Sequence, residues 1–481
     1  MIVLSFPVAA ILRAALRICL GLALGAPLAM PAWAATDGLT ALHQFQRNDG
    51  AGPSGRLVQG ADGRFYGVTY YGGADDLGTV FAVSTDGSFQ SLHAFSGADG
   101  EGPIAGLIEH GSGTFYGSTP SGHRVVAGTQ TRFGGTIFRL TATGGLQTLR
   151  TFEPDQPNDG AGPGALVDGR DGWLYGTTFS GGANGRGTVF KMAPDGTFVT
   201  LHHFTAAEGS GPNYLGLTLA SDGKFYGALD VGPNDGFHGA IFSVTPSGTV
   251  SIVHVFDVND GSKPLGGLVE ATPGTFYGTA FIGGRGGAGT LFRLTANGRF
   301  SLLHSFDTPT GGQAFPLALG PDGNFYGVQQ FTGDLYYGNI FRLTPSGSFS
   351  TLRLLTSGEG TTPNGAPVFG SDGVLYGVSR GGGQFGNVFK FDALTQQPST
   401  LSMALYCWRA YEGLCLRWGY GVSWNSANLD TCQASGAWSG AKPTAGRMEV
   451  KPPRRGGTFV YQLNCTGPGG DKSASLTVNV P

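Results

Sequence analysis

Cysteine is absent from residues 36–403 of this 481-residue chain, and no His-x-x-x-His pattern occurs. Without such clusters, the sequence offers no set of ligands for a catalytic metal. The missing cysteine also excludes a copper site built on a cysteine-modified tyrosine. Gly-x-Ser-x-Gly elbows, phosphate loops and dinucleotide fingerprints are missing from any strand-to-helix context. We therefore expect no metal and no cofactor, and favour a protein without enzymatic activity.

Charge and helical periodicity are scarce as well. Charged residues make up 13% of the chain, the net charge is −3, and no basic cluster occurs. A nucleic-acid partner is excluded because its phosphates require positive charge. No long stretch has the period of a helix, whereas 86 glycines and many aromatic residues predict short strands joined by tight turns. The sequence predicts an all-β protein.

No segment is apolar for long enough to span a membrane. The apolar run at 18–30 follows Arg13 and Arg17 and precedes Ala32-Trp33-Ala34, which is the pattern of a secretory signal peptide and its cleavage site. We expect residues 1–34 to be this signal peptide and the mature chain to be soluble. The protein would then be periplasmic, extracellular or associated with the cell surface.

One motif recurs seven times along the chain. A Tyr-Gly pair preceded by Phe or Leu returns at intervals of about 50 residues, with its tyrosine at Tyr66, Tyr116, Tyr175, Tyr226, Tyr277, Tyr326 and Tyr376. After each pair come a glycine-rich stretch, an apolar strand, a turn with glycine, another strand, and a Gly/Pro-rich loop that leads to a fourth strand. Four short strands in each period of about 50 residues are typical of a β-propeller blade.

The number of strands predicts how the ring closes. We label the strands of a blade A, B, C and D, with the Tyr-Gly pair in B. The seventh blade has no D strand after Phe391, whereas a D strand at 39–45 precedes the first A. We therefore predict a seven-bladed β-propeller over residues 37–391. Its N-terminal outer strand completes the last blade and removes the exposed sheet edges.

A well-defined repeat unit contains Asp171 to Thr178, then Gly181-Gly182, then Gly187 to Lys191. This unit resembles the Gloeobacter/Verrucomicrobia (GloVer) tandem repeat of choice-of-anchor exported proteins, and the resemblance covers residues 37–391. It implies export with a retention device that varies, and it brings no established activity. The kelch repeat has a similar length and a Gly-Gly pair after strand B, but its later tryptophan is missing from every copy.

The composition changes after the repeats. Residues 392–400 read as a linker, and residues 401–481 contain four cysteines, four tryptophans and a terminal alternating strand. Three motifs stand out in this segment, at 422–425, 432–440 and 461–467. Together they resemble a bacterial Ig-like domain, a small β-sandwich. In that pattern Cys432 and Cys465 would bond across two strands, with Trp424 packed nearby.

Cys407 and Cys415 would form the second pair of this domain. Four cysteines allow three connectivities, and the sequence alone does not choose among them. Oxidised cysteines agree with an exported protein.

Residues that recur in every blade are expected to be structural. The D strands carry a histidine or an arginine at one position, namely His43, His93, Arg150, His202, His254, His304 and Arg353. A catalytic base is needed once, whereas packing and hydrogen bonding are needed in each blade. The seven tyrosines are interpreted in the same way.

Acidic residues in the loops allow two interpretations. Asp-Gly pairs favour the positive φ angles of tight hairpins. Asn-Asp-Gly triplets at 48–50, 158–160 and 259–261 could offer oxygens to calcium, but they lack the alternating acidic spacing of a dedicated loop, so we favour turns. Glu109, Asp168 and Glu270 end three A strands, and we interpret them as solvated rim residues in preference to catalytic acids.

The two faces of the predicted ring differ. The A–B and C–D connections are tight turns, whereas the D–A and B–C connections are long and varied, with the longest insertion at 120–135. Variable loops on a rigid scaffold commonly bind ligands. The candidate binding residues on this long-loop face are Tyr70, Tyr71, Asp75, Asp76, His123, Arg124, Arg132, Arg186, Asp235, His238, Arg285, Tyr336 and Tyr337.

Two functions remain as hypotheses. The first is an exported, non-catalytic propeller that binds a protein or glycan through its long-loop face, with the Ig-like domain as a spacer or adhesion module. The alternative is a periplasmic or secreted lyase or lactonase that uses the central channel. A convergent acid, base or metal at the channel mouth would favour the enzyme, whereas the apolar A strands oppose it.

Overall fold

The described chain is all-β, as the sequence predicts. The computed structural model describes residues 38–480, apart from 127–128, 154–155, 157, 308–311, 332–336, 357–359, 382, 395–399, 408–409, 412–413, 416–419, 428–430, 444–445, 451–456 and 467–471. Within this part of the chain all paired strands are antiparallel, and the one helix is the 3-10 turn η1 (Pro233–Asp235).

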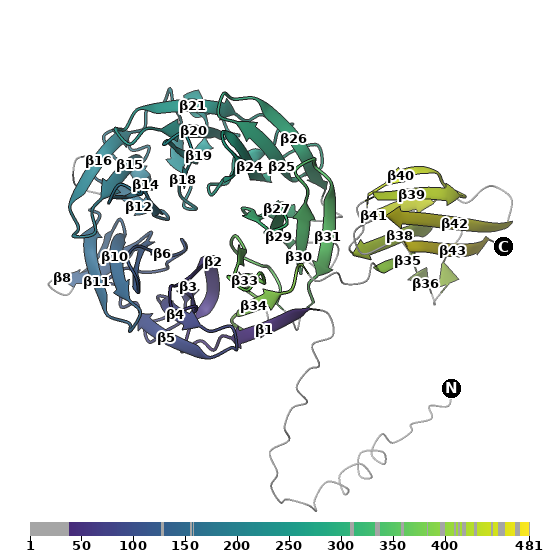
Figure 1. The fold of residues 1–481 in the computed structure, drawn as a ribbon, viewed down its shortest axis with the longest axis horizontal. Coiled ribbons are helices and arrows are strands. Elements are labelled where there is room, and N and C mark those ends of the chain that lie inside the picture. The colour runs from purple at the N-terminus through teal and green to yellow at the C-terminus, as the bar shows by residue number, and fades with distance from the viewer. Residues whose placement is uncertain are drawn as a thin grey trace, which may run out of the picture. The chain divides into compact units, whose positions relative to one another are not determined.

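Residues 39–391 form seven antiparallel sheets of four or five strands, which lie around a ring in Figure 1. The innermost strands are β2 (Ala51–Gln59), β6 (Ile108–Glu109), β12 (Gly160–Pro163) with β13 (Val167–Asp168), β17 (Ser210–Pro212) with β18 (Thr218–Leu219), β22 (Ser262–Pro264) with β23 (Val269–Thr272), β27 (Gly312–Ala314) with β28 (Ala318–Leu319), and β32 (Val368–Phe369). The second strands are β3 (Phe65–Tyr71), β7 (Thr114–Thr119), β14 (Leu174–Gly181), β19 (Phe225–Val231), β24 (Thr275–Ile282), β29 (Phe325–Phe331) and β33 (Leu375–Ser379).

Two further strands lie outside these in each sheet. The third strands are β4 (Thr79–Val83), β10 (Thr136–Thr141), β15 (Thr188–Met192), β20 (Ala240–Val244), β25 (Gly287–Thr295), β30 (Asn339–Leu343) and β34 (Asn387–Phe391). The outer strands are β5 (Phe89–Ala94), β11 (Leu146–Thr151), β16 (Phe198–His203), β21 (Val250–Val255), β26 (Phe300–Asp307), β31 (Phe349–Leu354) and, in the seventh sheet, β1 (Leu39–Gln44). The insertion at 120–135 contains a two-stranded hairpin of β8 (Gly122–Val126) and β9 (Thr129–Phe133).

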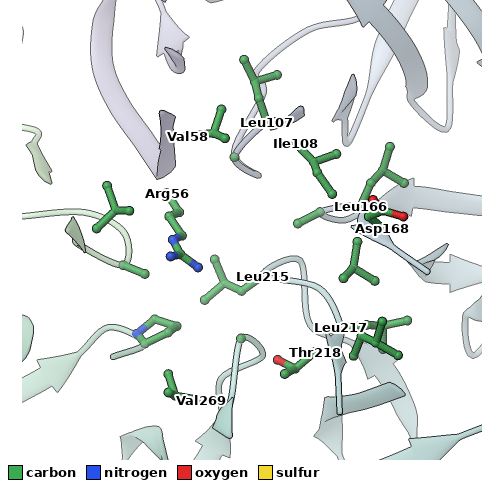
Figure 2. Close-up of a pocket in the computed structure, with 18 of the residues that line it drawn as sticks. Arg56, Val58, Leu107, Ile108, Leu166, Asp168, Leu215, Leu217, Thr218 and Val269 are labelled. Carbon is green, nitrogen blue, oxygen red and sulfur yellow. The ribbon is translucent and has the colours of Figure 1, made fainter. Parts of the chain in front are cut away.

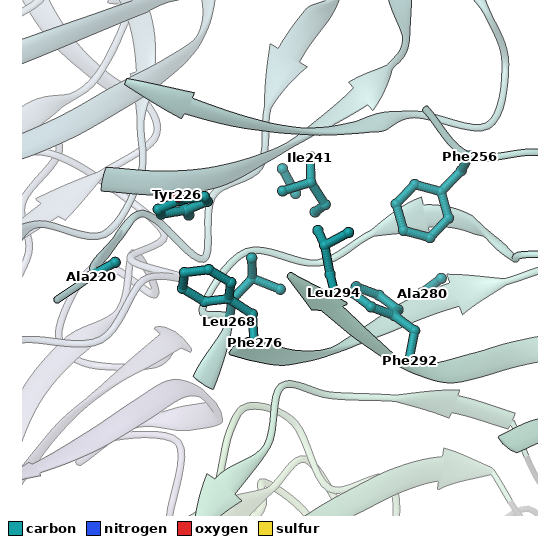
Figure 3. Close-up of a cluster of buried hydrophobic side chains, with 10 residues drawn as sticks. Ala220, Tyr226, Ile241, Phe256, Leu268, Phe276, Ala280, Phe292 and Leu294 are labelled. Carbon is teal, nitrogen blue, oxygen red and sulfur yellow. The ribbon is translucent and has the colours of Figure 1, made fainter. Parts of the chain in front are cut away.

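The Tyr-Gly motif explains why neighbouring sheets pack closely. A Cβ atom at Gly67 would come within 2.6 Å of Phe81 Cζ, so glycine makes room for the phenylalanine of the third strand. The tyrosine ring points towards the next sheet, where Tyr66 stacks on Phe115 with their centroids 3.9 Å apart. Figure 3 shows the corresponding cluster between the fourth and fifth sheets, in which Tyr226 meets Phe276. Offset aromatic pairs of this kind add to the free energy gained by burying their apolar area.

The first and seventh sheets make the same kind of contact as the others. Phe65 of the first sheet stacks on Tyr376 of the seventh at 4.0 Å. Strand β1 pairs with β34 in antiparallel register, from Leu39 opposite Phe391 to Gln44 opposite Asn387. The two ends of the repeat region therefore meet in one sheet.

Each outer strand is bent by a bulge at one position. In the first sheet His93 pairs with Val80 and Ser91 with Phe81, so that Leu92 is the extra residue between them. The shift recurs one residue before the recurring histidine or arginine of each outer strand. A bulge redirects the side chains that follow it, which here are the recurring histidine or arginine.

The C-terminal segment folds into two small sheets. One contains β35 (Thr400–Cys407), β38 (Tyr420–Ala427) and β41 (Gly446–Val450). The other contains β39 (Thr431–Gly436), β40 (Gly440–Lys442), β42 (Gly457–Thr466) and β43 (Lys472–Val480), and β36 (Ala410–Tyr411) pairs with β37 (Leu414–Cys415). Val422 and Trp424 of the first sheet share a core with Leu463 and Tyr461 of the second.

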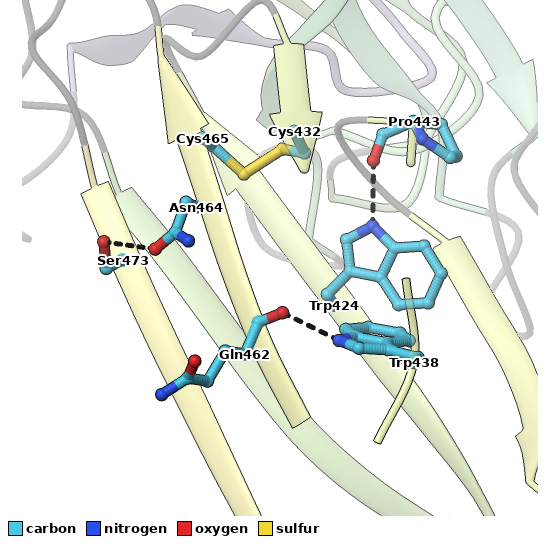
Figure 4. The surroundings of a disulfide bond; sticks show 8 residues. All are labelled: Trp424, Cys432, Trp438, Pro443, Gln462, Asn464, Cys465 and Ser473. Carbon is cyan, nitrogen blue, oxygen red and sulfur yellow. Dashed lines mark hydrogen bonds between the residues drawn. A yellow bond between two sulfur atoms is a disulfide. The ribbon is translucent and has the colours of Figure 1, made fainter. Parts of the chain in front are cut away.

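The predicted bond between Cys432 and Cys465 is present, and Trp424 and Trp438 lie near it in the same core (Figure 4). The two cysteines stand directly opposite each other on β39 and β42, so the bond joins neighbouring strands of one sheet. An immunoglobulin bond joins two sheets instead. The backbones of Cys407 and Cys415 lie in β35 and β37, but their side chains fall outside the described part, and their pairing stays a prediction.

Candidate functional site

On the short-turn face, five of the seven turns between the innermost and second strands carry Asp-Gly at their tips. The glycines Gly63, Gly172, Gly223, Gly323 and Gly373 all have positive φ. The aspartate before each glycine accepts a hydrogen bond from the repeat tyrosine at 2.7–2.9 Å, in the pairs Tyr66–Asp62, Tyr175–Asp171, Tyr226–Asp222, Tyr326–Asp322 and Tyr376–Asp372. Burial, together with this bond, raises the pKa of Tyr66 to about 12. These tyrosines are structural, and each anchors a turn.

The recurring histidines hold the loops between sheets. His93 Nε2 lies 2.7 Å from Asp99 Oδ2, and Asp99 also accepts a hydrogen bond from the backbone N–H of Ser96. Equivalent pairs, at 2.9–3.2 Å, are His43–Asp49, Arg150–Asp159, His202–Glu208 and His254–Asp260. The structural interpretation of these positions is confirmed, and the aspartates of the three Asn-Asp-Gly triplets are the carboxylates in these pairs.

The carboxylates at the ends of the A strands fasten neighbouring sheets. Glu270 accepts hydrogen bonds from the N–H and hydroxyl of Ser221, both at 2.7 Å. Glu109 accepts one from the N–H of Ala61, and Asp168 lies 3.3 Å from His110 Nδ1. Our description of them as solvated rim residues was incomplete, because their oxygens are engaged by neighbouring groups. They form no pair suited to acid–base chemistry.

Four of the residues predicted to bind a ligand instead form ion pairs within the molecule. Asp76 forms an ion pair of 2.5 Å with Arg47, and Arg186 forms one of 2.7 Å with Asp235. His123 Nδ1 lies 2.7 Å from a carboxylate oxygen of Glu101. A side chain that is held by an ion pair offers less to a ligand than a free one, because binding must first break the pair. These residues hold the loops of the long-loop face.

The remaining predicted residues are scattered over this face. Tyr71 is 54% exposed and meets Tyr70 edge-on, whereas Asp75 and Arg285 are exposed. Tyr337 packs against the core between the sixth and seventh sheets. The ring nitrogen Nδ1 of His238 is buried without a hydrogen-bond partner among the described residues. Arg124 and Arg132 have described backbones only, in the β8–β9 hairpin, and Tyr336 lies outside the described residues.

A ring of residues that vary from sheet to sheet surrounds the channel mouth on the long-loop face. These residues lie close to the ends of the second strands, four positions after the repeat tyrosine, and they are Tyr70, Pro120, Phe179, Asp230, Phe281, Gln330 and Arg380. The innermost strands begin at the same level, since Pro53 pairs with Thr69 and Pro212 with Leu229. Of this ring, the sequence analysis had singled out Tyr70 alone.

Aromatic rings gather on one side of this mouth. Tyr214, between β17 and β18, stacks on Phe179 of β14 with centroids 4.9 Å apart and planes 10° apart. Burial raises the pKa of the Tyr214 phenol, and the charges of Asp230 and Tyr70 raise it further. Tyr70 belongs to the first sheet, and its ring lies beside Gly102, where an added Cβ atom would come within 3.2 Å of it.

A half-buried carboxyl lies beside these rings. Asn213 Nδ2 donates a hydrogen bond of 3.2 Å to Asp230. Burial raises the pKa of Asp230, and the hydrogen bond from Asn213 and the charge of Lys263 oppose the increase. A Cβ atom at Gly211 would lie 3.2 Å from Phe179 and 3.4 Å from Asp230, so these two side chains flank one glycine. We call Tyr70, Phe179, Asn213, Tyr214, Asp230 and Lys263 the mouth site.

The backbone is strained at one edge of the mouth site. Each innermost strand has a position equivalent to Pro53 of the first sheet, and the residue before this position has positive φ in every sheet. In the first four sheets that residue is a glycine, namely Gly52, Gly102, Gly162 and Gly211. In the next three sheets Lys263, Gln313 and Thr362 adopt φ values of 54°, 58° and 52°. Residues other than glycine in this region cost free energy and tend to persist where function needs the side chain.

Apolar side chains line the channel that the innermost strands enclose. A cavity of about 600 Å³ is bordered by leucines and valines of all seven sheets, and Figure 2 shows Arg56 pointing into its centre. Among the residues that the structure describes, no three His, Cys, Asp or Glu side chains come close enough together to hold a metal ion. The same part of the chain has no helix that is both long and apolar enough to cross a membrane.

Sequence reasoning missed Phe179, Asn213, Tyr214, Asp230, Lys263 and Arg56. Phe179, Asp230 and Arg56 lie at fixed distances from a Tyr-Gly pair, so an alignment of the seven repeats by these pairs would have found them. Side chains differ most between repeats at positions where the repeat fold does not require a particular one. Tyr214 is harder to find, because its loop differs in length from the corresponding loops.

An all-β ring of repeated sheets with a variable mouth defines the class of this protein as a propeller-like repeat protein. The family model of the Gloeobacter/Verrucomicrobia repeat matches residues 32–133, 127–271 and 216–408, and the chain belongs to this family. The predicted recognition of the repeat is thereby confirmed, whereas the Ig-like character of residues 401–481 stays a prediction. No curated protein sequence matches the chain.

Similar solved structures include three distant ones. A gluconolactonase from Xanthomonas campestris is 14% identical over 60% of this chain and 85% of its own, with a TM-score of 0.38. A protein of unknown function from Dyadobacter fermentans is 11% identical over 73% and 96%, with a TM-score of 0.40. A puromycin hydrolase is 12% identical over 86% and 59%, with a TM-score of 0.42. Likenesses this weak carry no argument about activity.

Proposed function

We propose that this chain is an exported, non-catalytic β-propeller of seven blades, closed by β1, that binds a carbohydrate at the mouth site. The stacked pair Phe179 and Tyr214 beside the Asn213–Asp230 hydrogen bond carries this proposal. Residues 401–481 serve as an Ig-like spacer or adhesion module. The disulfide Cys432–Cys465 supports export, because such bonds persist in oxidising compartments.

The chemistry of the mouth site suits a sugar. A sugar ring has apolar C–H faces, which pack on aromatic rings, and hydroxyl edges, which require hydrogen-bond partners. Phe179, Tyr214 and Tyr70 supply the rings, and Asn213 and Asp230 supply an amide and a carboxyl. Ligand sites in proteins commonly combine apolar walls with a few placed polar groups. The exposed ring of Tyr71 extends the apolar surface outward.

A binding screen tests this proposal directly. The secreted form of the full chain is screened on a glycan array, and each hit is measured by isothermal titration calorimetry. Tyr214→Ala and Phe179→Ala should each weaken binding at least tenfold, which is about 1.4 kcal/mol. Trp173→Ala, which changes an aromatic residue on the short-turn face, is the matched control and should leave binding unchanged.

The outcomes separate the ligand classes. Equal affinity of Tyr214→Ala and the parent chain would remove the mouth site from the function. If no glycan binds, and an envelope protein binds in a manner sensitive to the same two variants, the ligand is a protein surface at the same place.

The second candidate function is a lyase or lactonase, and Asp230 is the observation that favours it. Burial raises the pKa of this carboxyl, and a raised pKa is a property of carboxyls that act as general acids. Turnover of a lactone or a polysaccharide by the purified chain, abolished in Asp230→Asn, would establish the enzyme. Binding of the same compound without turnover would support the non-catalytic function.

A further inference from the structure

Arg56 breaks the pattern of the channel wall. The innermost strand of each sheet has an equivalent position, two residues before the partner of the repeat tyrosine. In six sheets this position holds Gly106, Ala165, Gly216, Gly267, Pro316 or Ala366. In the remaining sheet, the first, this position holds Arg56, two residues before Val58, which pairs with Tyr66. Since the fold uses a small residue everywhere else, it does not require this arginine.

The charge of Arg56 is not neutralised inside the protein. No side chain in the described part of the chain forms an ion pair or a hydrogen bond with its guanidinium. The acidic residue lining the same cavity, Asp168, is used elsewhere, because it lies 3.3 Å from His110 and accepts a hydrogen bond from the N–H of Arg170. The Arg56 side chain is exposed to the solvent of the channel, and a guanidinium stays protonated in proteins. A cation thus stands in the channel without a counter-charge.

The cavity around Arg56 combines apolar side chains with a few polar ones, among them Gln59, Asp168 and Thr218. Figure 2 shows Leu215, Leu217, Leu107 and Val58 around the same cavity. A carboxylate in this cavity would meet a guanidinium that no side chain of the described part neutralises, beside leucines that can cover an apolar body. The cavity of about 600 Å³ is of the size that holds small organic ligands.

The short-turn face gives access to Arg56. A second cavity, of about 720 Å³, is lined by Arg56 and by residues of the short turns, among them Asp171 and Gly223. A ligand can therefore reach the guanidinium without passing the mouth site, which lies at the other end of the channel.

We propose that the channel is a second binding site, in which Arg56 holds the carboxylate of a small organic acid and the leucines hold its apolar body. A planar carboxylate matches the two parallel N–H donors of a guanidinium. The guanidinium of Arg56 favours a carboxylate, and the leucines of the wall favour an acid with an aromatic or branched aliphatic body. This site is independent of carbohydrate binding at the mouth site.

Benzoate and benzamide test the proposal, because they share a shape and differ in charge. Calorimetry on the full chain should detect benzoate and should not detect benzamide at concentrations up to about 10 mM. Acetate, which lacks the apolar body, should bind at least tenfold more weakly than benzoate. Arg56→Met should reduce benzoate affinity at least tenfold, since a charge-assisted pair is lost.

Two controls make the result decisive. Arg139→Met removes a partly exposed arginine outside the channel, whose guanidinium donates a hydrogen bond of 2.6 Å to Gln147, and this variant should bind benzoate normally. Arg56→Ala recreates the residue found at two equivalent positions and should keep the melting temperature of the parent while losing benzoate. Equal binding of benzoate and benzamide, unchanged affinity in Arg56→Met, or no binding of benzoate would each overturn the proposal. Carbohydrate binding should persist in Arg56→Met, which separates this site from the mouth site.

Discussion

Tyr175 donates a hydrogen bond of 2.8 Å to Asp171, and four other sheets repeat this pair. In the second sheet Ser112 stands where the aspartate would be, so Tyr116 occupies the same place without a carboxylate partner from its own turn. The repeat therefore contains its own comparison between a bonded and an unbonded tyrosine.

Tyr175→Phe should lower the free energy of unfolding by about 1 kcal/mol, because a buried hydrogen bond to a carboxylate is lost. Tyr116→Phe removes the same atom without that bond and should have a smaller effect. Urea denaturation followed by fluorescence measures both. Equal losses in the two variants would mean that the aspartate contributes nothing.

His304 stacks on Phe349 at 4.3 Å, and burial lowers its pKa to about 4. The unfolded chain binds a proton near pH 6.5, whereas the folded chain resists it, so this residue makes stability fall as the pH drops from about 6.5 to about 4. The loss is about 3 kcal/mol at most. His304→Phe should flatten that part of the stability curve. His254→Phe, which deprives Asp260 of its partner, should instead lower stability at neutral pH.

At the scale of strands and loops, the sequence predicted what repeats and missed what does not. The Tyr-Gly pairs, Asp-Gly turns and recurring histidines behave as predicted because the same local physics acts on every copy. Tyr214 and Asp230 occur once, and their meeting depends on how separate sheets converge at the channel mouth. The pairing of Arg186 with Asp235 likewise joins loops that are distant in sequence.

Lys263, the middle residue of strand β22, offers a test of backbone strain at the scale of a single strand. Lys263 has φ of 54°, where the first four sheets have glycine. Lys263→Gly should raise the free energy of unfolding by about 1 kcal/mol, since the left-handed conformation costs glycine nothing. The same change should weaken carbohydrate binding if the lysine contributes to the mouth site. Lower stability in this variant would show that the side chain, and not the backbone, dominates.

At the scale of the whole ring, the contact between the first and seventh sheets decides stability. The outer strand β1 supplies its backbone partners to β34, and a Cβ atom at Gly87 would lie 2.9 Å from Leu42 O, as one at Gly144 would from Leu92 O at 2.6 Å. In both contacts a C–D turn lies against the bulge of the preceding sheet. The interface between the seventh and first sheets therefore has the same geometry as the interface between the first and second sheets.

Deletion of residues 39–45 should expose the edge of β34 and cause aggregation or a large fall in the melting temperature. A rearranged chain that carries these residues after Phe391, joined by a turn such as Thr344–Ser348, should recover the stability of the parent. Differential scanning calorimetry compares the three chains. A deletion variant as stable as the parent would contradict the proposed closure.

The pairing of β1 with β34 also sets the order of events during biosynthesis. The ribosome makes β1 before any other strand of the ring and makes its partner last. Until β34 emerges, β1 has no sheet to join, and the remaining sheets have no closed circle to complete. The nascent protein must therefore wait in an incomplete state for almost the whole of its translation.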